Sequence, residues 1–289
     1  MTDYLVYDVF TDTPFGGNPL AVIPDARGLD TALMQNITRE FNFSETTFVL
    51  PPDDPAHTAK VRIFTPSAEL PFAGHPTIGT GIALADMGQG PDMVFELGVG
   101  PIPVTAKDGA ARFVTNTPLT KGAQPTTSEI ADCLGLAPAA IRTDRHPPQM
   151  AGVGLTFCLT ELTDTATLSR AVTSLAAFQH AADRYADRPN FGLFAYVRDY
   201  VRDGTRIHAR MFAPTGGIPE DPATGSASAA LTAYLADLDT APIALDIAQG
   251  VDMGRPSRIV TKAAYADGAV TNVTVSGQAR RVMEGRLTV

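Results

Sequence analysis

Residues 62–66 read Arg-Ile-Phe-Thr-Pro and residues 210–214 read Arg-Met-Phe-Ala-Pro, which match at three of five positions with a separation of 148. Three further pairs of proline or glycine residues continue the match, with a deletion of two residues after the first pair: Pro71 with Pro219, Pro76 with Pro222, and Gly79 with Gly225. Each copy has the pattern of a strand, a proline-containing loop and a helix. Self-similarity over such a distance predicts two similar domains that arose by duplication.

Strand-length apolar stretches bounded by Gly, Pro and Asp occur in both halves of the chain, so each half contains a sheet. Helical spacing of apolar residues predicts helices over 30–41, 76–87, 128–135, 168–182 and 222–236. A Pro-, Gly- and Thr-rich stretch over 117–128 is interpreted as a linker. We therefore expect an N-terminal domain over 1–117 and a C-terminal domain over 128–278. The pattern alone leaves strand 281–289 open to either domain.

The composition restricts the partners. The chain has 289 residues with 22 Lys and Arg against 31 Asp and Glu, a formal net charge of −9. Such a surface repels phosphate backbones and anionic lipid head groups, so nucleic acid and membrane are disfavoured as partners. No secretory leader or apolar run of membrane-spanning length occurs, and Cys133 and Cys158 show no metal-ligand spacing. We expect a cytoplasmic protein whose two cysteines are small buried hydrophobes.

The two repeated loops are the first candidate site. His75-Pro76 and Asp221-Pro222 each place a polar side chain at an expected N-cap and proline at the first helical position. Free N–H groups and the helix dipole favour an anion at such a helix start. Two of these starts facing each other across a domain cleft would form a carboxylate-sized site, with His75 and Asp221 on its wall. The alternative is that both residues are ordinary helix caps.

Glu45 is the second candidate. It lies in the stretch 42–49, Asn-Phe-Ser-Glu-Thr-Thr-Phe-Val, between a predicted helix and a predicted strand. Burial among Phe43 and Phe48 would raise the pKa of its carboxyl, as a general acid or base working near neutral pH requires. The alternative is an exposed glutamate at a strand end. Phosphate-binding loops and zinc-ligand spacings are lacking in the sequence, so proton transfer without a cofactor or metal is the simplest enzymatic interpretation.

Several motifs in the same order resemble the PhzF-like family of phenazine-biosynthesis isomerases and their relatives, within the wider diaminopimelate-epimerase fold. These motifs extend almost from end to end of the chain: 8–10 (DVF), 17–22 (GNPLAV), 44–49 (SETTFV), 62–66 (RIFTP), 69–77 (ELPFAGHPT), 219–227 (PEDPATGSA), 249–250 (QG) and 253–257 (MGRPS).

The resemblance implies an α+β fold of two pseudo-symmetric domains, each an antiparallel, barrel-like sheet around a central helix that begins at Pro76 or Pro222. It places the active site in the cleft between the domains and returns strand 281–289 to the N-terminal domain. It also implies a homodimer and a reaction without cofactor or metal.

In the phenazine isomerase of this family, a glutamate removes a proton from one carbon of a dihydro-hydroxyanthranilate and returns it to another. Carried over by motif, that residue is Glu45, with His75 and Asp221 as further catalytic residues. Gly74, Gly225 and Ser226 would bind a small carboxylate-bearing substrate. The alternatives are a non-catalytic binding or scaffold protein of the same fold, and an amino-acid or hydroxy-acid racemase or dehydratase. Racemases of this fold use two cysteines from the matching loops, and Cys133 and Cys158 lie in neither.

Overall fold

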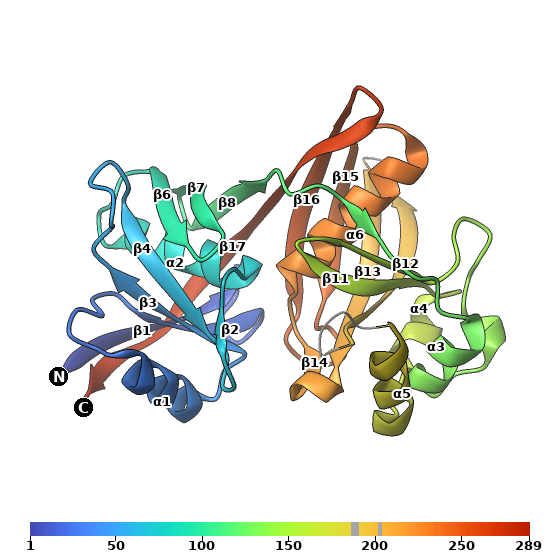
Figure 1. Cartoon of the computed structure of the whole chain (residues 1–289), viewed down its shortest axis with the longest axis horizontal. Helices are drawn as coiled ribbons and strands as arrows, with labels where there is room; N and C mark the ends of the chain where they lie inside the picture. The colour runs from blue at the N-terminus through green and yellow to red at the C-terminus, as the bar shows by residue number, and fades with distance from the viewer. Residues whose placement is uncertain (186–190, 202–203) are drawn as a thin grey trace. The chain divides into compact units, whose positions relative to one another are not determined.

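The computed structural model describes residues 1–185, 191–201 and 204–289, which form two compact units (Figure 1). Unit 1 consists of Met1–Thr115 and Thr274–Val289, and unit 2 consists of Asn116–Val273. Each unit has one sheet and one central helix, which confirms the predicted α+β fold with a barrel-like sheet around a helix.

Eight strands close the sheet of unit 1 into a ring. In order around the ring they are β1 (Thr2–Val9), β2 (Asn18–Ile23), β3 (Glu45–Leu50), β4 (Ala59–Phe64), β6 (Asp92–Leu97), β7 (Gly100–Lys107), β8 (Ala110–Thr115) and β17 (Ala269–Leu287). The β2–β3 and β4–β6 pairs are parallel, whereas β1–β2, β3–β4, β6–β7, β7–β8 and β1–β17 are antiparallel. The short strand β5 (Glu69–Leu70) pairs with β4, and α1 (Thr31–Phe41) packs against β3 and β4.

Helix α2 (Gly74–Asp86) is the central helix of unit 1 and packs against β1, β2, β3, β7 and β8. Eleven of its residues are buried, as expected for a helix that is apolar all round and enclosed by a sheet. Its glycines allow the close approach, because a Cβ at Gly79 would lie 2.6 Å from side-chain atoms of both Leu20 and Val9. The strands therefore fit around the bare backbone of this helix.

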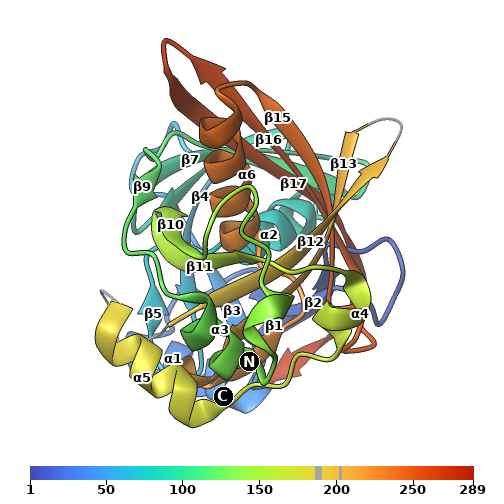
Figure 2. The same ribbon diagram turned by 90° about the vertical axis from the view of Figure 1, so that its right-hand side faces the viewer.

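The sheet of unit 2 repeats the same alternation of strand directions. Its strands are β9 (Thr120–Lys121), β10 (Gln149–Val153), β11 (Leu155–Glu161), β12 (Leu193–Val201), β13 (Gly204–Ala213), β14 (Ile218–Asp221), β15 (Ile243–Gln249) and β16 (Ser257–Ala266). The β11–β12 and β13–β15 pairs are parallel, and β10–β11, β12–β13 and β15–β16 are antiparallel. Helix α6 (Gly225–Asp239) packs against β10, β11, β15 and β16 (Figure 2).

Strand register corrects the alignment of the two copies. Ile63 pairs with Leu70 in unit 1, and Met211 pairs with Asp221 in unit 2. Since Ile63 and Met211 are equivalent at a separation of 148, Leu70 and Asp221 are equivalent at 221 − 70 = 151. The second copy thus carries an insertion of three residues, in the turn that contains η2 (Pro214–Gly216), where the sequence match suggested a deletion of two. The proline matches were misleading because prolines recur on both sides of this turn.

The predicted helix over 168–182 is wrong as one helix. The chain forms α4 (Thr165–Ser169) and α5 (Leu175–Tyr185), and the backbone between them turns away to bond the end of α3 (Thr127–Leu134). There the N–H of Val172 donates to the carbonyl of Leu134 over 2.9 Å. This contact joins positions 38 residues apart (172 − 134), so the apolar spacing could not reveal it.

The interpretation of 117–128 as a bare linker is also wrong, because it contains β9, in which Lys121 pairs with Ala151 of β10. At the other end, 281–289 is not a separate strand. Residues 281–287 are the end of β17, which begins at Ala269 and reaches β1, where Leu287 pairs with Thr2.

Candidate active site

Glu45 is the first residue of β3, as the motif predicted. Helix α1 ends in a left-handed residue, Asn42 (φ 54°), which turns the chain into this strand. Glu45 pairs with Leu20 of β2, and the hydroxyl of Ser44 donates to the side chain of buried Asn18 over 2.8 Å. These contacts tie the start of β3 to β2 and fix the place of the carboxylate.

The structure brings Glu45 and His75 together. His75 Nδ1 lies 3.4 Å from Glu45 Oε2, and the two side chains are 4% and 13% exposed. His75 is the second residue of α2, so the first turn of the central helix presents its imidazole to the strand end. Glu45 and His75, which are 30 residues apart in the sequence (75 − 45), thus form one polar pair with a buried imidazole and a partly buried carboxylate.

Burial decides the charge of His75. Desolvation lowers the pKa of His75 to about 3, although a hydrogen bond with the backbone of Pro19 acts in the opposite direction. The imidazole is therefore neutral near pH 7. His75 Nε2 is buried and has no hydrogen-bond partner among the described residues. We assign the proton to Nδ1, which leaves Nε2 as a hydrogen-bond acceptor inside the site.

Asp221, the second candidate loop residue, ends β14 in unit 2 and is 7% exposed. Its Oδ2 accepts a hydrogen bond from the hydroxyl of Thr224 over 2.5 Å. Helix α6 begins just beyond, with Gly225 as its first residue and Ser226 as its second. The structure therefore places Asp221 near the start of the central helix of unit 2, and His75 is likewise near the start of the central helix of unit 1.

The predicted N-caps are wrong in both units. The N-cap of α2 is Ala73 and that of α6 is Thr224. His75 lies inside the helix, and Asp221 lies outside it because β14 extends to that residue. At the corrected separation of 151, Gly74 matches Gly225 and His75 matches Ser226, so His75 and Asp221 are not equivalent positions of the repeat.

Glu45 has no equivalent acid in unit 2. Thr46 pairs with Phe64 and Leu193 pairs with Phe212, and Phe64 and Phe212 are equivalent at 148. The residue before Leu193, Gly192, therefore occupies the place of Glu45. A Cβ at Gly192 would lie 2.9 Å from the ring of Phe157, so this place has no room for a side chain.

An Arg–Glu ion pair that the sequence did not reveal holds each of the two loops. Arg62 bonds both carboxylate oxygens of Glu69 over 2.7 and 2.6 Å, and Arg210 bonds both oxygens of Glu220 over 2.8 Å. Glu69 and Glu220 are equivalent at the corrected separation, 220 − 69 = 151. The same bidentate contact thus anchors the loop before each central helix.

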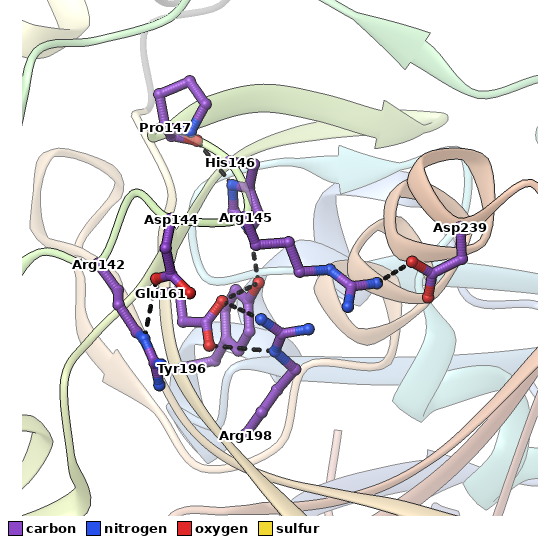
Figure 3. Close-up of polar contacts among 9 residues, drawn as sticks. All are labelled: Arg142, Asp144, Arg145, His146, Pro147, Glu161, Tyr196, Arg198 and Asp239. Atoms are coloured by element: carbon purple, nitrogen blue, oxygen red, sulfur yellow. Dashed lines mark hydrogen bonds and ion pairs between the residues drawn. The ribbon is translucent and has the colours of Figure 1, made fainter.

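Unit 2 also contains a buried polar network (Figure 3). Arg198 bonds both oxygens of Glu161 over 3.0 and 2.7 Å, and the Tyr196 hydroxyl lies 2.6 Å from His146 Nε2. Arg145 makes a separate ion pair with Asp239 at the end of α6. The network ties β11 and β12 to the segment before β10, and residues so far apart in the sequence gave no pattern from which to predict it.

Both cysteines are fully buried, as predicted. Cys133 lies in α3 and Cys158 in β11, and burial raises the pKa of each thiol to about 12. Neither lies in the loops before α2 and α6. Within the described ranges no three His, Cys, Asp or Glu side chains gather as metal ligands would. The described helices include none that could cross a membrane.

The comparisons with known proteins agree with the resemblance seen in the sequence. A family model described as PhzC-PhzF, phenazine biosynthesis-like protein, matches residues 7–285. An uncharacterized isomerase of Mesorhizobium japonicum is 38% identical over 301 residues, and trans-2,3-dihydro-3-hydroxyanthranilate isomerase of Pseudomonas aeruginosa is 34% identical over 299 residues. Each match covers 99% of both chains. A PhzF-family phenazine biosynthesis protein of Bacillus anthracis has the same fold, with a TM-score of 0.87, 23% identity and coverage of 100% of this chain and 99% of that one.

Proposed function

We propose, for a chain that belongs to the PhzC-PhzF family of phenazine biosynthesis-like proteins and is an isomerase, that Glu45 moves a proton on a small carboxylate-bearing metabolite. We further propose that the reaction needs no cofactor or metal. The substrate of the Pseudomonas aeruginosa relative, as its name gives it, is the first compound to test.

One observation carries this proposal: the Glu45 carboxylate lies 3.4 Å from a buried imidazole and is itself 13% exposed. A carboxylate at this place can take a proton from one substrate carbon and return it to another. A single base serves both steps when both carbons lie on the same face of the substrate. The neighbouring His75 is neutral at neutral pH and therefore places no positive charge of its own beside the Glu45 carboxylate.

His75 would assist by accepting a hydrogen bond from a polar group of the substrate at Nε2, the buried nitrogen without a partner in the described residues. Backbone N–H groups at Gly74 and Gly225, in the first turns of α2 and α6, would bind the substrate carboxylate. Asp221 and Ser226 would contact further polar groups of the substrate. Whether both units serve one cleft stays a prediction.

Racemase and dehydratase chemistry has less support. Either reaction would need a second base opposite Glu45. The position of unit 2 that is equivalent to Glu45 holds Gly192, where an added Cβ would collide with Phe157. The cysteines cannot replace that base, because Cys133 and Cys158 are buried outside the two loops. A measurement of turnover distinguishes the proposed isomerase from a non-catalytic binding or scaffold protein.

The test compares the wild type with Glu45→Gln, using trans-2,3-dihydro-3-hydroxyanthranilate in heavy water. Glutamine keeps the size of the side chain and removes the base. Turnover should fall about 100-fold or more, as for the loss of a general base, while ligand binding survives. Solvent deuterium should appear at the carbon that receives the proton to the extent that the proton held by Glu45 exchanges with water before it is returned. Wild-type turnover that persists in the variant would refute the role of Glu45, and a wild type that binds the compound without turning it over would favour the non-catalytic alternative.

A further inference from the structure

Three equivalent positions differ in polarity between the units. The strand β15 ends beside β13 as β6 ends beside β4: His208 pairs with Ala248, and Lys60 pairs with Glu96. The next residues of β6 and β15, Leu97 and Gln249, are therefore equivalent as well. With the loop equivalences already established, unit 1 has three apolar residues where unit 2 has three polar ones: Leu70, Ala73 and Leu97 against Asp221, Thr224 and Gln249.

Packing around two glycines confirms this equivalence independently. Gly98 follows the strand end in unit 1, and a Cβ there would lie 2.7 Å from the Cα of Pro71. Gly250 follows it in unit 2, and a Cβ there would lie 2.6 Å from the carbonyl oxygen of Pro222. In both units the strand end thus lies directly against the proline of the loop that leads into the central helix.

The three polar residues of unit 2 form a continuous chain of hydrogen bonds. Gln249 is fully buried, and its Nε2 donates to the backbone carbonyl of Asp221 over 2.7 Å and to Thr224 Oγ1 over 3.0 Å. Its Oε1 accepts from the backbone N–H of Thr224 over 3.1 Å. The Thr224 hydroxyl in turn donates to Asp221 Oδ2. The amide therefore orients the hydroxyl, and the hydroxyl orients the carboxylate.

Unit 1 shows that the fold does not require these groups, because Leu70, Ala73 and Leu97 build the same loop, strand end and helix start. We propose that Thr224 and Gln249 are positioning residues that hold the Asp221 carboxylate in one orientation toward the substrate. This inference rests on the proposed function of Asp221. Neither residue touches the substrate in this proposal.

The kinetic test uses Gln249→Leu and Thr224→Val, with trans-2,3-dihydro-3-hydroxyanthranilate as substrate. Each variant should lose about 10-fold or more in kcat/KM, the effect expected when hydrogen bonding to a charged group is disturbed. Thr224→Ser, which keeps the hydroxyl, should recover most of the loss. In an Asp221→Asn background the two variants should have almost no further effect, since the carboxylate they orient is gone. Full additivity in that background would overturn the proposal.

Gln149→Leu is the matched control. Gln149 is also buried and donates to backbone carbonyls, those of Gly122 and Met150, each over 2.9 Å. It has no contact with Asp221 among its hydrogen bonds. This variant should lose thermal stability but leave kcat/KM unchanged. A loss of kcat/KM equal to that of Gln249→Leu would show a general effect of burying a leucine and would contradict a positioning role.

A stability measurement needs no ligand. The triple variant Asp221→Leu/Thr224→Ala/Gln249→Leu gives unit 2 the residues of unit 1, so we expect it to fold with a Tm no lower than that of the wild type. A Tm many degrees lower would show that the polar triad holds the fold, and would overturn the proposal whatever the substrate.

Binding separates the failure of this inference from the failure of the proposed function. Affinity for 3-hydroxyanthranilate is measured by calorimetry in the Glu45→Gln protein, with and without Gln249→Leu. Weaker binding with Gln249→Leu would support the positioning role even if the wild type turned over no test compound. Turnover that depends on Glu45 and Asp221 but not on Gln249 or Thr224 would refute the positioning role and leave the proposed function intact.

Discussion

Units 1 and 2 have the same succession of parallel and antiparallel strands around a central helix, but their polar residues differ at equivalent positions. Unit 1 has Glu45 where unit 2 has Gly192, and unit 2 has Asp221 where unit 1 has Leu70. What the copies share, such as the Arg–Glu pair beside each loop, serves the fold. Under the proposed function, what differs marks the places where one copy has acquired chemistry, and the repeat then works as an internal control.

The largest expected effect concerns the ion pair inside unit 2. Arg198→Met would leave the carboxylate of Glu161, 2% exposed, buried without its partner. Removing one member of a buried ion pair costs about 3–5 kcal/mol, so the Tm should fall steeply. Thermal unfolding followed by circular dichroism measures this. As control, Arg286→Met breaks an exposed pair with Asp3, which solvent screens, and should leave the Tm almost unchanged. Equal effects would mean that the buried pair adds nothing specific to unit 2.

Acid should destabilise unit 1 through His75. Its pKa is about 3 in the folded protein against an ordinary value of 6.5, so between these pH values the unfolded chain binds the extra proton. Stability due to this group is complete above pH 6.5 and declines, by up to about 1.4 kcal/mol per pH unit, as the pH falls toward 3. His75→Asn should flatten the pH dependence of the unfolding free energy in this window. The exposed His180→Asn serves as control, and parallel curves for wild type and His75→Asn would contradict the prediction.

The central helices offer a smaller test. Gly79 of α2 is equivalent to Ala230 of α6 at the separation of 151. Gly79→Ala would place a methyl group 2.6 Å from Leu20 and Val9, so overpacking should cost about 1–3 kcal/mol despite the better helix propensity of alanine. Ala230→Gly should cost about 1 kcal/mol from propensity. Urea unfolding of both variants measures the difference, and a stabilised Gly79→Ala would show that the sheet of unit 1 yields easily around its helix.

The smallest effect is expected at Tyr7. Its hydroxyl donates to Asp86 Oδ2 over 2.8 Å at the end of α2, and burial together with that carboxylate raises its pKa. Tyr7→Phe should reduce stability by about 1.5 kcal/mol, the lower end for a hydrogen bond to a charged group, because this bond is only partly buried. In unit 2, Tyr234→Phe provides the comparison. An equal loss of stability in Tyr234→Phe would mean that the effect of Tyr7→Phe does not come from the hydrogen bond to Asp86.

The sequence predicted the features that depend on neighbouring residues. The motif around Glu45 located a strand start, and apolar spacing located α1, α3 and most of α2 and α6. The duplication was visible as well. The exact correspondence of the copies was not, because it depends on which residue of β14 faces which residue of β13.

The sequence placed Gln249 in a family motif without giving it a role, and it did not single out Gly192; both gaps have one cause. Gln249 lies 28 residues after Asp221, and Gly192 follows Glu45 by 147 residues, so no local pattern connects them. Glu161 and Arg198 are likewise joined only by the pairing of β11 with β12. The sequence predicts single polar residues, whereas the contacts that give them a role come from strand register.

The course of β17 has a consequence for folding during synthesis. The strand pairs with β1 and β8 and closes the ring of unit 1, yet it follows every other strand of both units along the chain. While unit 2 is being synthesised, β1 and β8 therefore each have an unpaired edge. Such edges can pair with strands of other chains and lead to aggregation. The β1–β17 pairing joins Thr2 to Leu287 and so closes a loop of nearly the whole chain. Closure of the ring should therefore be the slow step of folding. It should also be the step that benefits most from a chaperone.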